Sequence, residues 1–222
     1  MAVKWRVAGI FFFILLCFGY GCGKSEEKER GKVLSEAMVI YKEEFPVLAY
    51  TVDGEGNLYT VGNKTTETSM EENGVYHLHQ YDNKQNLLWE YSFDPSFAGV
   101  DALAVQGRTI YFTASRVVAG KGSCISLCAL DMDLNEINIL SDYTFYDRIH
   151  QMLLQEGRLY LLGGKDYSVK ARRLGGSDGY SFYEDRLIYY DLEEEESYAV
   201  GIEYPIRMAF AEDGSLMVHA YM

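Results

Sequence analysis

The chain has 222 residues, of which 48% are hydrophobic, and its 33 acidic and 20 basic side chains give a formal charge of −13. This hydrophobic content argues for a packed core rather than disorder, and the length suits one large domain or two small ones. The acidity argues against nucleic acid and anionic lipid headgroups as partners.

The first 21 residues have the pattern of an export signal. Lys4 and Arg6 precede an uncharged run rich in Phe and Leu over residues 7–21, which is shorter than the roughly 20 apolar residues of a spanning helix. We therefore expect a signal helix over residues 1–21, with a permanent transmembrane helix as the weaker alternative. The run ends in Gly21-Cys22, which resembles the lipobox of bacterial lipoproteins.

This resemblance implies a diacylglycerol on Cys22, which would hold the chain by its lipid on the extracytoplasmic face of a bacterial cell membrane. Ordinary secretory cleavage near the same place is the alternative, and it also exports the protein. Cleavage would remove two basic and no acidic residues, so 33 acids would face 18 bases and the formal charge would be −15. Residues 22–46 would then form a lipidated N-terminus and linker, beginning with a charged spacer.

From Val47 onward the sequence repeats itself. In each unit one strand-like segment ends in a glycine turn and a second apolar strand follows at once; the turn residues are Gly56, Gly107, Gly157 and Gly214. These glycines are 51, 50 and 57 residues apart. A second landmark is an aromatic or aliphatic residue before Asp and a polar turn, found at Tyr81-Asp82, Leu130-Asp131 and Tyr190-Asp191. Four strands that recur about every 50 residues are typical of the blades of a β-propeller.

The first unit shows the four strands most clearly. Its predicted strands are rich in Tyr, Val, Leu and Thr and span Val47 to Val52, Asn57 to Gly62, Val75 to Tyr81 and Leu87 to Phe93. We predict an all-β fold, an incomplete β-propeller over residues 47–222, after the signal helix. Its three four-stranded blades would lie at about 47–99, 100–147 and 148–204, and half of a fourth at 205–222.

The sequence of these repeated units is similar to the propeller repeats related to quinoprotein dehydrogenases, known as PQQ-like repeats. Gly74-Val75-Tyr76 leads through Tyr81-Asp82-Asn83 to Leu88-Trp89-Glu90. The resemblance covers residues 47–222 and implies architecture rather than activity, since propellers host many unrelated functions. The N-terminal part of the chain is also similar to lipid-anchored propellers that precede a solute-binding domain of an ABC transporter. Because a closed ring usually needs four to eight blades, we expect a truncated chain, with a fragment of a longer gene or half of an assembly as the alternatives.

The best candidate recognition surface is an insertion in the third unit, Lys165 to Asp185. It carries a basic patch in an otherwise acidic protein, and we expect it to form a long loop of the kind that contacts ligands, with a flexible surface loop of no binding function as the alternative. The candidate residues in it are Lys170, Arg172, Arg173 and Tyr180.

Other side chains carry weaker functional hypotheses. His77 and His79 share one strand face but have no third ligand attached by sequence, so we expect no metal. Residues 53–57 resemble the start of a calcium loop, although a tight turn explains them better. Nineteen tyrosines suggest sugar stacking, yet those in predicted strands are better explained by core packing. Cys124 and Cys128 lie too far apart on one strand to bridge each other, so we expect two small semi-buried residues.

These features predict a lipid-anchored, extracytoplasmic module for binding or scaffolding, with no catalytic site and no cofactor. Its partners would be the membrane, through the lipid, and a protein or carbohydrate ligand. The alternatives are the N-terminal part of an ABC-transporter solute-binding lipoprotein and a fragment of a quinoprotein-type enzyme. No nucleophile elbow, phosphate-binding loop or metalloprotease helix is present in the sequence.

Overall fold

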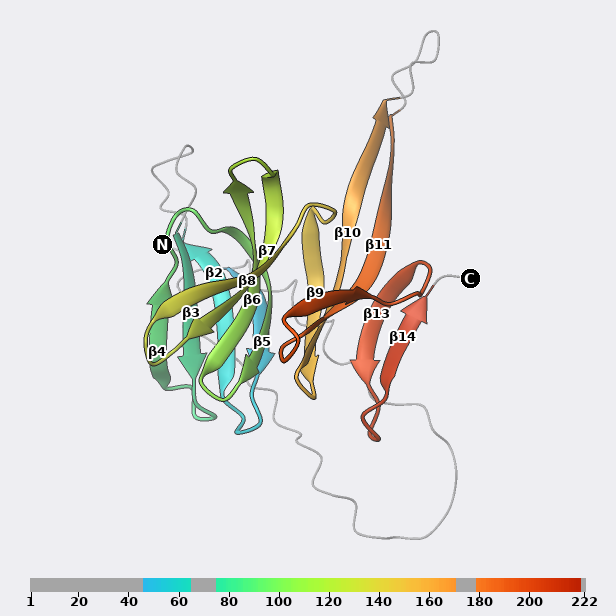
Figure 1. The fold of residues 1–222 in the computed structure, drawn as a ribbon. Coiled ribbons are helices and arrows are strands. Elements are labelled where there is room, and N and C mark those ends of the chain that lie inside the picture. The colour runs from blue at the N-terminus through green and yellow to red at the C-terminus, as the bar shows by residue number, and fades with distance from the viewer. Residues whose placement is uncertain (1–45, 65–74, 171–178, 221–222) are drawn as a thin grey trace, which may run out of the picture. The chain divides into compact units, whose positions relative to one another are not determined.

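The computed structural model describes residues 46–64, 75–170 and 179–220, and within these ranges the regular secondary structure is entirely β-strand (Figure 1). The expected signal helix over residues 1–21 lies outside the described residues. The all-β prediction is confirmed for the part of the chain that is described.

The strands form four antiparallel sheets in chain order, which is a propeller-like arrangement. The first sheet contains β1 (Val47–Val52), β2 (Leu58–Lys64), β3 (Val75–Tyr81) and β4 (Leu87–Ser92). The second contains β5 (Ala98–Gln106), β6 (Thr109–Val118), β7 (Gly122–Asp131) and β8 (Glu136–Tyr143).

The third sheet contains β9 (Arg148–Gln155), β10 (Arg158–Lys170), β11 (Gly179–Asp191) and β12 (Glu196–Ala199). The fourth has two strands, β13 (Pro205–Phe210) and β14 (Leu216–Ala220). In every sheet the strands pair in sequence order, so each sheet is a simple meander. This local pairing is why the repeat could be read from the sequence.

Short polar turns set the register of each meander. The predicted turn glycines Gly56, Gly107, Gly157 and Gly214 all have positive φ, between 59° and 84°, which side chains with a Cβ rarely adopt. The Asp of the second landmark caps the turn between the third and fourth strands. For example, Asp82 Oδ1 accepts the backbone N–H groups of Lys84 and Asn86 at 2.8 Å each.

Consecutive sheets pack face to face, and three apolar clusters fill the spaces between them. The cluster between the first and second sheets includes Tyr59, Leu78, Val100 and Phe112. Side chains on the opposite face of the second sheet, such as Ala102, Ile125 and Leu127, pack on Ile149 and Leu161 of the third. A smaller cluster around Leu162, Leu187 and Met208 joins the third sheet to the fourth. The second sheet is therefore buried on both faces.

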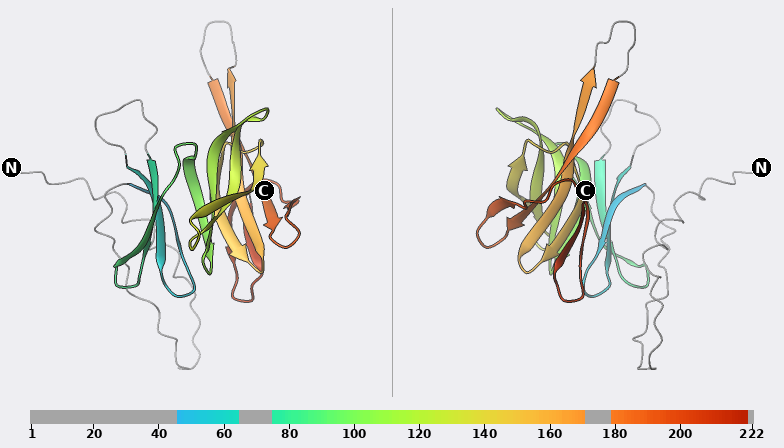
Figure 2. Two further views of the ribbon diagram at one scale, coloured as in Figure 1. Left: turned by 60° about the vertical axis from the view of Figure 1, so that its left-hand side comes forward. Right: turned by 90° about the vertical axis from the view of Figure 1, so that its right-hand side faces the viewer.

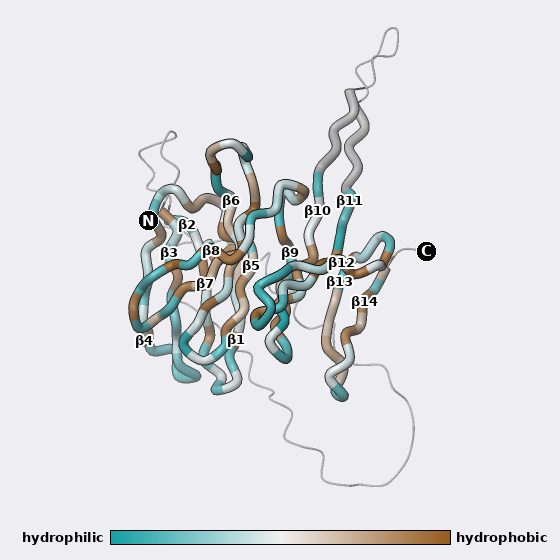
Figure 3. Tube along the Cα trace, in the orientation of Figure 1, coloured by the Kyte–Doolittle hydropathy of each residue, from teal (hydrophilic) through white to brown (hydrophobic). Residues whose placement is uncertain are grey.

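The first strand of each sheet lies against the first strand of the next, as the contacts of β5 with β1 and β9 and of β9 with β13 show. Hydrophilic residues gather at the hairpin turns and hydrophobic ones within the strands (Figure 3). One face of β1 is an exception, because Leu48, Tyr50 and Val52 are 54–61% exposed. This face points away from the second sheet, towards which Ala49 turns.

Both described cysteines lie on β7, are free and are buried, more deeply than expected. Burial raises the pKa of the Cys128 thiol to about 12. The thiol is therefore protonated at neutral pH, which suits a packing role.

Candidate binding cleft beside an extended hairpin

An open cleft of about 720 Å³ lies between the second and third sheets. Its walls come from the end of β8, the connection to β9, the strands β11 and β12, and the segment that leads to β13. Aromatic side chains and one arginine dominate its lining: Tyr143, Phe145, Tyr146, Arg186, Tyr198 and Tyr204.

Three aromatic residues, Tyr143, Phe145 and Tyr146, lie close together where β8 ends. Tyr146 is 4% exposed and packs edge to face against both Tyr143 and Phe145, with ring centroids 5.9 and 5.3 Å apart. Its hydroxyl donates to the carbonyl of Arg186 at 3.4 Å. Burial raises the pKa of Tyr146 well above its usual range, so this hydroxyl keeps its proton and fixes the wall of the cleft.

Arg186 crosses the cleft from β11. Its guanidinium lies 3.5 Å from the centre of the Phe145 ring and forms an ion pair with Glu184 at 2.7 Å. Stacking on an aromatic face and pairing with a carboxylate hold the planar group in place, although about half of the side chain stays exposed.

A second link joins the two sheets further along the cleft. Tyr143 of β8 and Ser197 of β12 share a hydrogen bond of 2.8 Å between their hydroxyl groups. Burial raises the pKa of Tyr143. The two hydroxyls satisfy each other, so neither is held against a histidine or carboxylate that would activate it.

Tyr204 stands at the lip of the cleft and is 63% exposed. Its backbone has φ of 51°, which is uncommon for a residue with a bulky side chain. Such a conformation costs free energy and persists where the surroundings hold it, often near ligand sites. This backbone conformation leaves the Tyr204 ring exposed to solvent beside Glu203.

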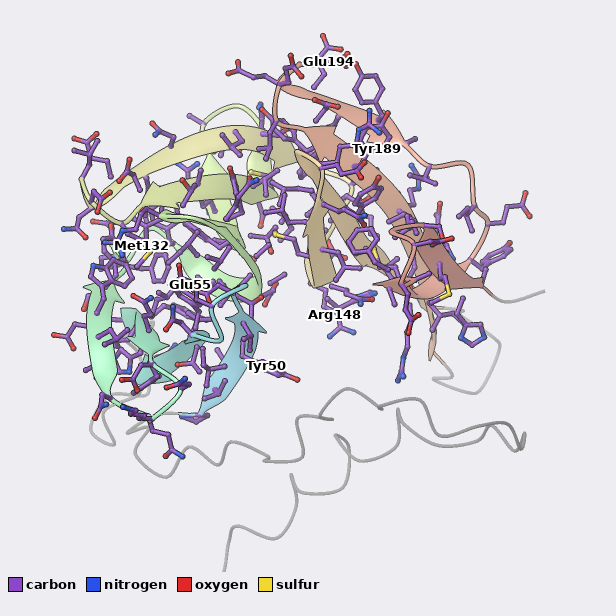
Figure 4. The ribbon with its side chains drawn as sticks, turned by 90° about the horizontal axis from the view of Figure 1, so that it is seen from below. Tyr50, Glu55, Met132, Arg148, Tyr189 and Glu194 are labelled. Atoms are coloured by element: carbon purple, nitrogen blue, oxygen red, sulfur yellow. The ribbon has the colours of Figure 1, made fainter. Side chains whose placement is uncertain are left out.

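Polar groups continue from the cleft towards the start of β9. Asp185 lines the cleft and lies 3.8 Å from His150, while burial lowers the pKa of this histidine. Asp101 on β5 has its pKa raised to about 6 by burial, an effect that the charge of Arg148 partly offsets. Arg148 points away from the sheets at the start of β9 (Figure 4).

Two glycines of β10 allow this close packing. A Cβ on Gly163 would collide with the carbonyl oxygen of Arg148 and lie 2.6 Å from Ile149 Cδ1. A Cβ on Gly164 would collide with the Asp185 carboxylate. The paired glycines thus let β9 and Asp185 approach β10 at the point where the register of β9 shifts.

The predicted recognition insertion is adjacent to the cleft, but much of it is not a loop. Residues 165–170 continue β10 and residues 179–185 continue β11, in unbroken register from Lys165↔Glu184 to Lys170↔Gly179. The two strands run beyond β9 and β12, as Figures 1 and 2 show. The prediction of a long loop is therefore wrong for these residues, because alternating Tyr, Val, Phe and Ser extend the antiparallel ladder.

Of the four candidate residues in this insertion, the structure places two. Lys170 ends β10, and Tyr180 is the second residue of β11, opposite Val169. Arg172 and Arg173 lie outside the described residues, and so does the predicted lipidation residue, Cys22.

The structure also places the residues of two weaker hypotheses. Residues 53–57 form the expected turn, in which Asp53 Oδ1 accepts the N–H groups of Glu55 and Asn57 at 2.9 and 2.8 Å. His77 and His79 share one face, with ring centroids 6.5 Å apart. Within the described ranges no three His, Cys, Asp or Glu side chains gather in a way that could hold a metal ion.

Sequence reasoning missed the cleft itself. Its residues lie between the repeated segments or at their ends, so the repeat pattern does not include them. The run Tyr143-Thr144-Phe145-Tyr146, between two units, was the available signal. Nothing in the sequence showed that Arg186 and Tyr204 would face it.

No protein-family model matches the chain, and no curated protein is similar to it in sequence. Among solved structures, it is similar to a mutant of Synechocystis apocarotenoid oxygenase at 12% identity and a TM-score of 0.44. That match covers 76% of this chain and 47% of the other. The described ranges contain no apolar helix of membrane-spanning length.

Proposed function

We propose that this chain is a ligand-binding module of the β-propeller type, carried on the extracytoplasmic face of a bacterial cell membrane by a lipid on Cys22. In this proposal the four sheets are three blades and half of a fourth, and they follow a cleaved signal helix. The meander topology and the stacking of consecutive sheets support the propeller, while the basic, apolar and Gly-Cys pattern of residues 4–22 supports the anchor.

The observation that carries the binding function is the aromatic cleft. It offers apolar ring edges, a fixed guanidinium and carboxylates in one open hollow, which is the usual composition of a binding site. Its lining contains no histidine or cysteine, and two of its hydroxyls bind each other. These groups suit recognition better than nucleophilic catalysis.

The anchor is tested by growing cells with radiolabelled palmitate and isolating the protein from the membrane fraction. We expect label on the wild-type protein and none on a Cys22→Ser variant, because the diacylglycerol is attached through the thiol. A Cys17→Ser variant is the matched control and keeps its label. Label that persists on the Cys22→Ser variant would overturn the lipid anchor.

The binding function is tested with a fluorescent reporter in the cleft. A Tyr204→Trp variant is titrated with a panel of soluble oligosaccharides and short peptides, and a Tyr50→Trp variant, which carries its reporter on the exposed face of β1, is the control. We expect a saturable change in emission from the first variant and not from the second. If no oligosaccharide or peptide changes the emission of Tyr204→Trp while leaving that of Tyr50→Trp unchanged, the cleft is not a binding site.

A further inference from the structure

Among the described residues, β11 has no neighbouring strand along about half of one edge. It spans Gly179–Asp191, whereas β12 pairs only with Ile188–Asp191. After Ala199 the chain adds one more hydrogen bond, from the Val200 N–H to the Leu187 carbonyl at 3.0 Å, and then turns away. Among the described residues, no strand pairs with this edge of β11 before Leu187.

The cleft lies where a longer β12 would continue. Its lining includes residues 184–188 of β11, residues 197–199 of β12 and the departing segment 200–204. Backbone groups alternate in direction along a strand. Because the Leu187 carbonyl points to this edge, the N–H and carbonyl of Asp185 point to it as well.

The two walls beside this edge differ in chemistry. On the side of the second sheet, Arg186 and Ile188 face the aromatic residues that follow β8. On the other side, Leu187 packs with Val200 and Ile202. Successive side chains of an added strand point to opposite faces, so they would meet an aromatic wall and an aliphatic wall in turn.

The charge of the cleft favours a basic occupant. Arg186 is already paired with Glu184, and Asp185 has His150 at 3.8 Å. Glu203 is exposed and makes no ion pair within the described part of the chain. The lining therefore holds three carboxylates against one guanidinium, which attracts positive charge and disfavours acidic partners.

We propose that the cleft binds an extended, basic peptide segment of a partner protein, which pairs with the free edge of β11 as an added strand. A basic side chain of this peptide lies near Glu203 and Asp185. The inference rests on the proposed binding function and names the class of its ligand. Strand addition supplies affinity through main-chain hydrogen bonds and specificity through alternate side-chain sites.

A peptide fits these groups better than a sugar does. Sugar stacking needs open aromatic faces inside the cleft, but the Phe145 face is covered by Arg186 and the Tyr146 ring is buried, whereas the exposed Tyr204 ring stands at the lip. A sugar would also leave the outward N–H and carbonyl of Asp185 without the paired donor and acceptor that a peptide backbone supplies.

The test uses the Tyr204→Trp protein and three synthetic peptides of one length. The first alternates lysine with tyrosine, the second is the same peptide with alternate backbone nitrogens methylated, and the third replaces lysine by glutamate. We expect the first to bind with a dissociation constant of about 1 mM or tighter, a range that suits a short unoptimised peptide. Methylation should weaken binding at least about tenfold, because it removes main-chain donors.

Charge is tested by Glu203→Gln in the same reporter protein. We expect this variant to bind the lysine peptide about two- to fivefold more weakly, as for an exposed ion pair, and the glutamate peptide more tightly. Glu212→Gln, which removes an exposed carboxylate in the turn between β13 and β14, is the matched control and leaves both affinities unchanged.

The outcomes separate this inference from the proposed function. Equal binding of the methylated and unmethylated peptides, or binding of oligosaccharides without peptides, overturns strand addition while the cleft remains a binding site. Failure of every peptide and every oligosaccharide to bind overturns both proposals.

Discussion

Asp101 is a carboxyl group in a site that disfavours its charge. Burial raises its pKa to about 6, and the nearby charge of Arg148 only partly offsets the effect. In the unfolded chain the same group titrates near 3.8. The folded protein therefore binds a proton more tightly than the unfolded chain does, and the resulting stabilisation is complete below about pH 4 and lost as the pH rises through 6.

We predict that Asp101→Asn stabilises the fold relative to wild type as the pH rises from about 5 to 8, because the amide cannot ionise. The gain should be on the order of 1 kcal/mol, since partial exposure screens the penalty. Urea unfolding of both proteins across this pH range measures it. Parallel stability curves for the two proteins would show that Asp101 is not desolvated in the folded state.

At the scale of single elements, the local signals in the sequence predicted the hairpins well. Gly157 marks the turn between β9 and β10, and Asp191 caps the turn before β12 through N–H groups two and three residues later. Each of these features depends on residues a few positions apart. Their effect on the backbone can therefore be read without knowledge of tertiary contacts.

The sequence did not predict the extension of β10 and β11, because this feature depends on the pairing of two strands and not on local turn residues. Charged and glycine-rich residues around positions 170–179 indicated a loop, whereas the flanking residues pair in register. The cleft was equally hidden, because Tyr146 and Arg186 are 40 positions apart and meet only once the second and third sheets stack. Contacts of this kind follow from packing and leave no periodic trace in the sequence.

Gly163 provides a test of the element that supports the site. We predict that Gly163→Ala destabilises the protein by about 1–3 kcal/mol, because the new methyl group meets the Arg148 carbonyl and Ile149. Gly54→Ala is the matched control, since its Cβ would meet nothing within 4 Å, and it should change stability by less than about 0.5 kcal/mol.

Thermal or denaturant unfolding of the two glycine variants gives the comparison directly. A Gly163→Ala protein as stable as the control would mean that β9 shifts without penalty. In that case the close approach of β9 to β10 would not be needed to hold Asp185 beside His150.

At the scale of the whole described unit, the exposed face of β1 sets how molecules meet one another. Tyr50 points away from the first sheet into solvent (Figure 4), with Leu48 and Val52 on the same face. Apolar residues grouped on one strand face promote association more than isolated ones do. We predict concentration-dependent self-association of residues 31–222, measurable by sedimentation velocity.

Replacing Tyr50 by Glu should lower this association, because a carboxylate then interrupts the apolar face. Leu134→Glu is the control, since Leu134 is also 66% exposed but lies alone in the turn between β7 and β8. Equal sedimentation of all three proteins at every concentration would show that the β1 face does not mediate contacts.

The burial of the second sheet on both faces has a consequence for how the molecule comes apart. Its central strands β6 and β7 hold Phe112, Thr113 and Leu127, all fully buried. Among the described strands, β13 and β14 contact, besides each other, only those of the third sheet. In stacked repeats each unit is stabilised by its neighbours, so the end units open first. Backbone amides of β13 and β14 should therefore exchange with deuterium fastest, and those of β6 and β7 should report the global unfolding of the protein.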